Sequence, residues 1–296
     1  MLPKFQELNI PVILGHGDVS GGVGYAKNRA CLQSTGEFLC FLDSDDVMEV
    51  DRLKLQYEAA LSTENNGQYA FVGSQFTRKP EGSTGRYARW ACNLSNDELQ
   101  NQIYTSFGPT LIAPTWFISR KLFDEVGGFN EQHLTGYPED LEFFYKALSL
   151  AQLRKVAKPL VMYRWHPGCA TFIVDEKTIF KLRIEELQRN ILENWETITI
   201  WNAGKHGRRF YKFLHPENQK KVIAFCDVSE RKIRQGFYEI YDETNRKVQA
   251  RIPIIHHKDA KPPTVLCVKL DMTDGQFEEY LAQKNWKESV DYVHFS

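Results

Sequence analysis

Short apolar runs alternate with helix-like stretches through the first half of the chain, and this alternation limits the folds that the chain can adopt. The apolar runs lie at 11–15, 37–43 and 68–74, and helices are expected over 22–35 and 50–62. Strands that alternate with helices are typical of a parallel-sheet α/β domain. We therefore expect both helices to pack on a sheet built from the apolar runs.

A second alternation follows a long amphipathic stretch. Apolar residues recur every three to five positions from Asp175 to about Ile198, which predicts a connecting helix. Strand-like runs then follow at 196–204, 221–227 and 264–270. The sequence therefore predicts a first α/β domain over 1–172, a connecting helix over 173–195 and a smaller, Rossmann-like α/β domain over 196–296.

Composition excludes several classes of protein. Hydrophobic residues make up 42% of the 296 residues and charged residues 25%, as in an ordinary folded protein rather than a disordered one. The net charge of −1 excludes nucleic-acid binding driven by bulk charge. No apolar stretch approaches the roughly 20 residues of a membrane span, and the six cysteines lack C-x-x-C spacing. We expect a soluble, cytoplasmic protein with reduced cysteines.

Three carboxylates directly follow the apolar run at 37–43. They are Asp43, Asp45 and Asp46, and in an open α/β sheet this position faces the ligand crevice. Because Asp43 and Asp45 are two positions apart, both can face one hard cation, such as Mn²⁺ or Mg²⁺. The alternative is a helix cap, for which Asp46 alone would suffice.

Further motifs occur in a fixed order around this cluster. They are Gly22 with Ala26-Lys27-Asn28, Gly36-Glu37 running to Asp43-Ser44-Asp45-Asp46, Val126-Gly127-Gly128-Phe129-Asn130-Glu131, Glu139-Asp140, and Tyr163-Arg164-Trp165-His166. In this order the motifs resemble glycosyltransferase family 2, whose members have the GT-A fold. The resemblance covers about 1–172.

The resemblance implies a UDP-sugar donor site at these positions. Asp43 and Asp45 would hold the divalent metal against the donor's diphosphate, and Lys27 and Asn28 would contribute to binding the donor. His166 would complete the metal site or contact the diphosphate. Without the resemblance, a lone histidine is more often a structural hydrogen-bonding residue, and both roles stay open.

The resemblance also implies a catalytic base. Asp140, with Glu139 as its neighbour, would take the proton from the acceptor hydroxyl as that oxygen attacks the anomeric carbon and inverts it. The alternative is structural, because acidic residues are favoured in the first turn of the helix expected after them.

The beginning of the chain departs from the family pattern. Members usually open with strands that hold uracil and ribose, and here about one to two βαβ units of roughly 30 residues each are missing. We therefore expect an N-terminally truncated GT-A domain, and a catalytically silent protein is the alternative to an active enzyme. Val161 stands where processive synthases have Gln, which argues against that class.

The second domain opens with a degenerate G-x-G-x-x-G motif, which lacks the first glycine. Asn202 replaces the first glycine, Gly204 and Gly207 follow, and Asp227 closes the next strand. The turn indicates either a Rossmann-like module that only packs, or a nucleotide site such as that of a nicotinamide-dependent oxidoreductase.

Positive charge is concentrated over residues 205–234. Between 201 and 236, nine Lys or Arg face three acids, so 9 − 3 gives +6, which suits a phosphate backbone or simply a solvated surface. Together with the family motifs, this domain resembles transferases that modify a tRNA nucleoside. That resemblance implies UDP-galactose as donor and a hydroxyl of queuosine in tRNA as acceptor. The alternatives are a UDP-GlcNAc transferase acting on a glycan and a tRNA-binding or structural protein without activity.

Overall fold

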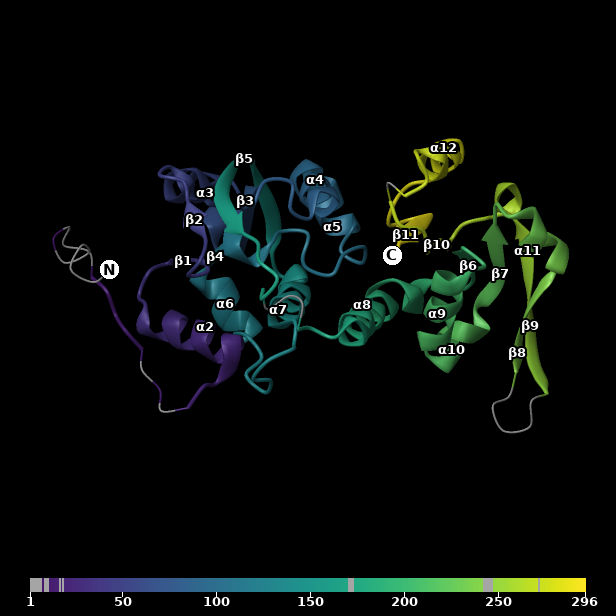
Figure 1. Ribbon diagram of the computed structural model, residues 1–296, viewed down its shortest axis with the longest axis horizontal. Helices are drawn as coiled ribbons and strands as arrows, with labels where there is room; N and C mark the ends of the chain where they lie inside the picture. The colour runs from purple at the N-terminus through teal and green to yellow at the C-terminus, as the bar shows by residue number, and fades with distance from the viewer. Residues whose placement is uncertain are drawn as a thin grey trace. The chain divides into compact units, whose positions relative to one another are not determined.

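The computed structural model describes residues 7, 11–15, 17, 19–169, 173–241, 247–270 and 272–296. The chain forms two compact units, whose elements are labelled in Figure 1. The first unit comprises 1–96 and 108–175, and the second comprises 97–107 and 176–296.

A five-stranded mixed sheet forms the centre of the first unit, in the order β1-β4-β3-β5-β2. Its strands are β1 (Phe38–Cys40), β2 (Val47–Met48), β3 (Ala70–Lys79), β4 (Phe117–Ser119) and β5 (Gln152–Arg164). The long strands β3 and β5 lie side by side and parallel (Figure 1), whereas the other neighbouring pairs are antiparallel. The sheet is therefore mixed rather than parallel, because β4 and β2 run opposite to the other three strands.

The two helices predicted in this unit are present. The helices are α2 (Gly22–Gln33), α3 (Arg52–Leu61), α4 (Gly85–Asn93), α6 (Arg120–Val126) and α7 (Glu139–Leu148), with short 3₁₀ turns at Glu64–Gly67 and Ala113–Thr115. The apolar run at 11–15, in contrast, forms no strand and its side chains are exposed.

Aromatic side chains fill the core between the sheet and α7. Trp116 is fully buried, and its ring packs against Phe71, Phe129 and Phe143. Its indole Nε1 donates to Leu111 O at 2.7 Å, so the one polar atom of this ring is satisfied. The core therefore lies directly beneath the residues that follow β1.

The second unit contains a six-stranded sheet in the order β11-β10-β6-β7-β9-β8. Its strands are β6 (Ile198–Trp201), β7 (Val222–Asp227), β8 (Phe237–Tyr241), β9 (Val248–His256), β10 (Thr264–Leu266) and β11 (Tyr292–His294). All neighbours are parallel except β8, which runs antiparallel to β9 in a long two-stranded ribbon (Figure 1). The predicted strands β6, β7 and β10 are confirmed.

The helices of the second unit are mostly short. They are α5 (Asn96–Asn101), α8 (Glu176–Asn190), α9 (Lys205–Phe213), α10 (Pro216–Lys220), α11 (Glu230–Gln235) and α12 (Gln276–Ala282), with 3₁₀ turns at Leu192–Asn194 and His257–Asp259. The amphipathic helix expected from Asp175 to about Ile198 corresponds to α8, which ends earlier, at Asn190.

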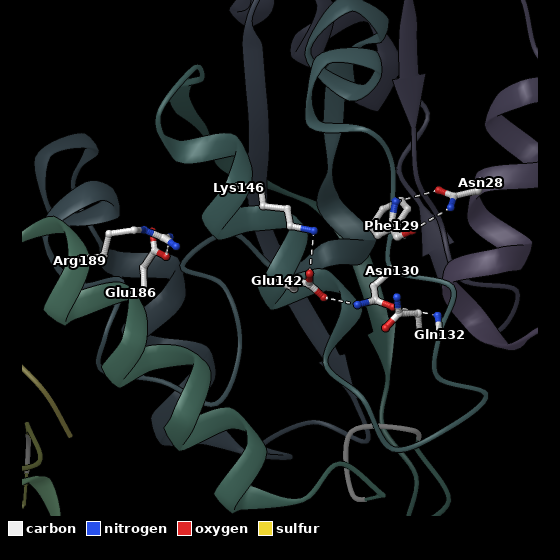
Figure 2. A network of polar contacts seen from close by, with 8 residues as sticks. All are labelled: Asn28, Phe129, Asn130, Gln132, Glu142, Lys146, Glu186 and Arg189. Atoms are coloured by element: carbon white, nitrogen blue, oxygen red, sulfur yellow. Dashed lines mark hydrogen bonds and ion pairs between the residues drawn. The ribbon is translucent and has the colours of Figure 1, made fainter. Parts of the chain in front are cut away.

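Helix α8 contacts segments that are distant in sequence, because the buried Arg183 donates to Tyr104 O and to Ser296 O. Within the helix itself, Arg189 pairs with Glu186 (Figure 2). Residues 97–107 thereby join the second unit although they precede half of the first.

Two sequence expectations concern the whole chain. No helix in the described ranges is long and apolar enough to cross a membrane. All six cysteines lie in described parts of the chain and are free thiols.

Candidate functional site

The loop that carries Asp43, Asp45 and Asp46, called here the carboxylate loop, begins where β1 ends. A buried arginine fixes its first residue. Phe41 N donates to Trp116 O at 2.9 Å, and Arg52 Nη2 donates to Phe41 O at 2.8 Å. Arg52 Nε donates to Gln56 Oε1 at 2.8 Å, and both side chains are fully buried in α3. The backbone that enters the loop is therefore held by a charged group from beneath the sheet.

Asp46 joins the loop to the end of β5. Its Oδ1 accepts from Arg164 N at 2.8 Å, and Arg164 Nε donates to Asp45 O at 2.9 Å. Burial raises the pKa of Asp46 to about 6, and the bond from Arg164 N opposes this. The N-cap of α3 is Asp51, so the interpretation of Asp46 as a helix cap is wrong.

This connection places His166 beside the loop. His166 Nε2 lies 3.4 Å from Asp45 Oδ2, and both side chains are about half exposed. Burial raises the pKa of Asp43, and the negative charge of Asp45 raises it further, whereas Lys27 lowers it. Across the residues that the structure describes, no group of three or more His, Cys, Asp or Glu is arranged to hold a metal ion. Asp45 and His166 are therefore two side chains that could ligate a hard cation, whose further oxygen ligands would have to come from a bound molecule.

Lys27, from α2, lies among three carboxylates. Its Nζ is 3.0 Å from Glu139 Oε1 and 5.2 Å from the centre of the Phe129 ring. Burial alone would lower the pKa of Lys27, but the charges of Glu139, Asp140 and Asp43 outweigh it and the pKa is raised. Lys27 therefore stays protonated and gathers the carboxylates that the sequence assigned to the metal and to catalysis.

Asp140 lies in the first turn of α7, with Leu141 N donating to its Oδ1 at 2.8 Å. Burial and then the charge of Glu139 raise the pKa of Asp140 to about 6, whereas Lys27 lowers it. An aspartate with this pKa is ionised at neutral pH and is a stronger base than an exposed one.

Asn28 holds the loop that follows α6. Its Nδ2 donates to Phe129 O at 2.9 Å and its Oδ1 accepts from Phe129 N at 2.8 Å (Figure 2). Gly128 has φ +76°, and a Cβ there would lie 2.8 Å from Asn28 Oδ1, so only glycine suits this position. The side chain is nearly buried, and the donor-binding role of Asn28 stays a prediction.

The same loop is tied to α7. Asn130 Nδ2 donates to Glu142 Oε2 at 2.9 Å, and Lys146 Nζ lies 2.7 Å from Glu142 Oε1. Gln132 N donates to Asn130 Oδ1 at 2.8 Å, so the loop folds back on itself (Figure 2). These contacts fix the helix turn that presents Asp140.

Sequence reasoning missed some of these supporting residues. Arg52 and Gln56 are four positions apart, so they share one face of α3, and that face is buried. Sequence gives no signal for this burial, because the apolar Leu53 and Tyr57 of the same helix are the ones left nearly half exposed. The bond between Asp46 and Arg164 has no sequence signal.

The degenerate glycine motif of the second unit forms a tightly packed turn between β6 and α9. A Cβ at Gly207 would overlap Asn202 O, and Asn202 has φ +115°. Asp227, at the end of β7, accepts from Ala203 N at 2.9 Å through its Oδ2. The glycine is thus required for the approach of α9 to β6, whether or not a ligand binds.

The basic stretch at 205–234 is partly engaged by the protein itself. Five cations bond to protein groups, namely Arg208, Arg209, Lys221, Lys232 and Arg234. Four have no ion pair or side-chain hydrogen bond within the described ranges, namely Lys205, Lys212, Lys220 and Arg231. The surface charge available to a partner is therefore smaller than the sequence count indicates.

Comparisons with known proteins find similarity in the first part of the chain. Residues 1–127 match the model of Glycosyl transferase family 2. An uncharacterized glycosyltransferase of Rickettsia felis is 24% identical over 162 residues, which is 52% of this chain and 26% of that protein. The predicted α/β fold class is confirmed.

Solved structures of S. aureus TarS are also similar. TarS 1-349 in complex with UDP-GlcNAc is 20% identical with a TM-score of 0.44, covering 72% of this chain and 56% of that one. A crystal structure of TarS is 18% identical with a TM-score of 0.42, covering 74% of this chain and 34% of that one. The chain thus spans about a quarter of the curated relative and about half or less of these structures.

Proposed function

We propose that the first unit transfers a sugar from a UDP-sugar to an acceptor hydroxyl with inversion. The observation that carries this proposal is the grouping of Asp43, Glu139 and Asp140 around Lys27, in a chain whose residues 1–127 match the family 2 glycosyltransferase model. Inverting transfer needs one base near the acceptor and positive charge near the leaving diphosphate. The grouping contains both kinds of charge.

Asp140 is the proposed base. It accepts the proton of the acceptor hydroxyl while that oxygen forms a bond to the anomeric carbon, and the bond from that carbon to the diphosphate breaks. The electron pair of the broken bond leaves with UDP. Glu139 pairs with Lys27 at 3.0 Å, and the charge of Lys27 in turn lowers the pKa of Asp140. Asp140 then works at neutral pH because its pKa is about 6.

Asp43, Asp45 and His166 are the residues that would hold Mn²⁺ or Mg²⁺. When bound, such a cation neutralises charge on the leaving diphosphate. The proposal is supported by the proximity of His166 to Asp45 and by the influence of Asp45 on Asp43. Asp45→Asn and His166→Gln should each weaken Mn²⁺ binding measured by electron paramagnetic resonance, and unchanged affinity in both would oppose the assignment.

We further propose UDP-galactose as donor and queuosine in tRNA as acceptor, with the reaction in the cytoplasm. Supporting this is the resemblance of the second unit's motifs to queuosine-tRNA galactosyltransferase. The motifs are WNAGK at 201–205, AFCDV at 224–228, RIPI at 251–254, CVKLD at 267–271 and HFS at 294–296. The unpaired cations of this unit give the RNA a surface of matching charge.

Substrate identity is tested by radiolabelled transfer. With Mn²⁺ present, label from UDP-galactose should enter tRNA that contains queuosine and should not enter the same tRNA with guanosine at that position. Label from UDP-GlcNAc should not enter either. Transfer that ignores queuosine, or that prefers UDP-GlcNAc, would refute the finer assignment while leaving the enzyme class intact.

RNA binding by the second unit has its own test. Substituting Lys205, Lys212, Lys220 or Arg231 by Gln should each reduce the slope of log K against log salt by about 0.7–0.9 for a cation that contacts phosphate. Lys54→Gln, on an exposed surface of the first unit, is the matched control and should leave the slope unchanged. Equal slopes in all five variants would contradict RNA binding by this surface.

A further inference from the structure

The second unit contains a small cavity that the proposed function does not use. Its volume is about 190 Å³. The residues that line it are Trp201, Asn202, Asp227, Val228, Lys232 and Val268. All but Lys232 lie at the carboxyl ends of β6, β7 and β10 or just beyond them. The cavity therefore lies at the end of the sheet where these parallel strands terminate.

The connectivity of the sheet explains why a cavity forms there. The chain runs from β6 to β7 and β9 on one side, then returns to place β10 and β11 on the other side of β6. The loops after β6 and β10 therefore diverge, and the crevice between them is the switch point at which open α/β sheets bind ligands. Asn202 spans this point, because its Nδ2 donates to Cys267 O at 2.8 Å.

A positioned cation lies in the cavity. Lys232 Nζ is 2.8 Å from Asp227 Oδ2, its one side-chain partner in the described ranges, so two of its three N–H groups remain for a ligand. Asp227 is itself fixed, because it also accepts from Ala203 N and Ser229 N, both at 2.9 Å. A Cβ at Gly204 would lie 3.1 Å from Lys232 Nζ, so the ammonium group lies over the turn that leaves β6.

The surroundings favour an anionic ligand. At the start of α9, after the turn that leaves β6, burial lowers the pKa of His206 and the charges of Lys269, Lys205 and Arg209 lower it further, whereas Glu176 raises it. Val228 and Val268 add an apolar wall for a sugar or base. Because 190 Å³ is below the roughly 300 Å³ of common small-molecule pockets, the space suits one phosphate and its sugar rather than a dinucleotide.

We propose that this cavity binds the phosphate group of a nucleotide, with Lys232 donating to a phosphate oxygen. Asp227 holds Lys232 in place and accepts a ribose hydroxyl with its remaining lone pair. The nucleotide is either a free mononucleotide or the terminal nucleotide of an RNA strand, which present the same chemistry. This site belongs to the second unit and does not depend on sugar transfer by the first.

Calorimetric titration of the full chain tests this site. The probes are UMP, AMP, inorganic phosphate and a short single-stranded RNA with a 5′-phosphate. Lys232→Met should weaken binding of the nucleotide at least about tenfold, as expected on losing a charge-assisted hydrogen bond. Lys287→Met removes the same charge from an exposed position that precedes the amino end of β11, away from the carboxyl ends that form the cavity. It should change the affinity by less than about twofold.

The outcomes separate the two sources. Binding of UMP or AMP that is lost in Lys232→Met supports a free nucleotide, and loss confined to the RNA probe supports a terminal nucleotide. No binding of any probe, binding of inorganic phosphate alone, or equal weakening in both variants would overturn the proposal. Should Lys232→Met fail to fold, Val228→Trp fills the cavity from an exposed position and is expected to abolish binding. Retained binding there would equally overturn it.

Discussion

Removing the guanidinium of Arg52 should destabilise the first unit strongly. In Arg52→Met, Phe41 O and Gln56 Oε1 lose a donor, whereas Trp116 O keeps the Phe41 N–H. Each buried acceptor left without a donor costs about 1–3 kcal/mol, so the two together should lower the free energy of unfolding by about 2–6 kcal/mol. Methionine has a similar length, which keeps the contribution of an empty cavity small.

Urea unfolding followed by tryptophan fluorescence measures this change. Lys54→Met removes a charge from an exposed position on the same helix and should change the free energy of unfolding by less than about 0.5 kcal/mol. Arg52→Lys retains one donor and should fall between the two, because lysine lacks the planar fork of arginine. An Arg52→Met variant as stable as Lys54→Met would refute the role given to this network.

Two further predictions concern pH. Transfer should rise with pH through about 6 as Asp140 ionises, and Lys27→Met should move that rise to higher pH because Lys27 lowers the pKa of Asp140; a rate that does not vary from about pH 5 to 8 would contradict this. In the second unit, burial lowers the pKa of His294 from 6.5 to about 4 and raises that of Glu288 from 4.5 to about 7. Their opposite contributions to the pH dependence of stability should cancel between about pH 4.5 and 6.5. Relative to the unsubstituted chain, His294→Gln should lose stability as pH rises, and Glu288→Gln should lose stability as pH falls. The free energy of unfolding measured by urea denaturation at several pH values should therefore change with opposite slopes in the two variants. Slopes of the same sign would contradict these opposite contributions.

Local periodicity predicted the elements whose stability comes from a buried face. Strands β6, β7 and β10 lie where apolar spacing placed them, and helices α2 and α3 lie within their expected ranges. The buried face of α3 is nevertheless polar, because Arg52 and Gln56 are buried while Leu53 stays nearly half exposed. The apolar run at 11–15 forms no strand, because apolar composition does not supply a neighbouring strand to pair with, and Ile13 and Leu14 stay more than half exposed. Strand β9 was missed because Pro253 lies within it, which argues against a strand from sequence alone.

The candidate site follows the same division between local and distant information. The spacing of Asp43 and Asp45 after an apolar run predicts carboxylates at a strand end, and the structure places them there. The bond from Arg164 N to Asp46 joins residues 118 positions apart, and no local pattern specifies such a contact. The gathering of Asp140 near Lys27 was available only through the family resemblance, since a carboxylate in a first helical turn has a sufficient structural explanation.

Asp140 is the proposed base of a sugar transfer, and its role can be tested directly. The most direct measurement is the rate at which the unsubstituted chain, Asp140→Asn and Glu81→Gln transfer labelled galactose from UDP-galactose to queuosine-containing tRNA with Mn²⁺. We predict that Asp140→Asn lowers the rate by at least about 100-fold, the usual contribution of a general base, with its urea unfolding unchanged. Glu81→Gln alters an exposed carboxylate and should transfer at the unsubstituted rate. Full activity in Asp140→Asn, or no transfer by the unsubstituted chain, would contradict the account.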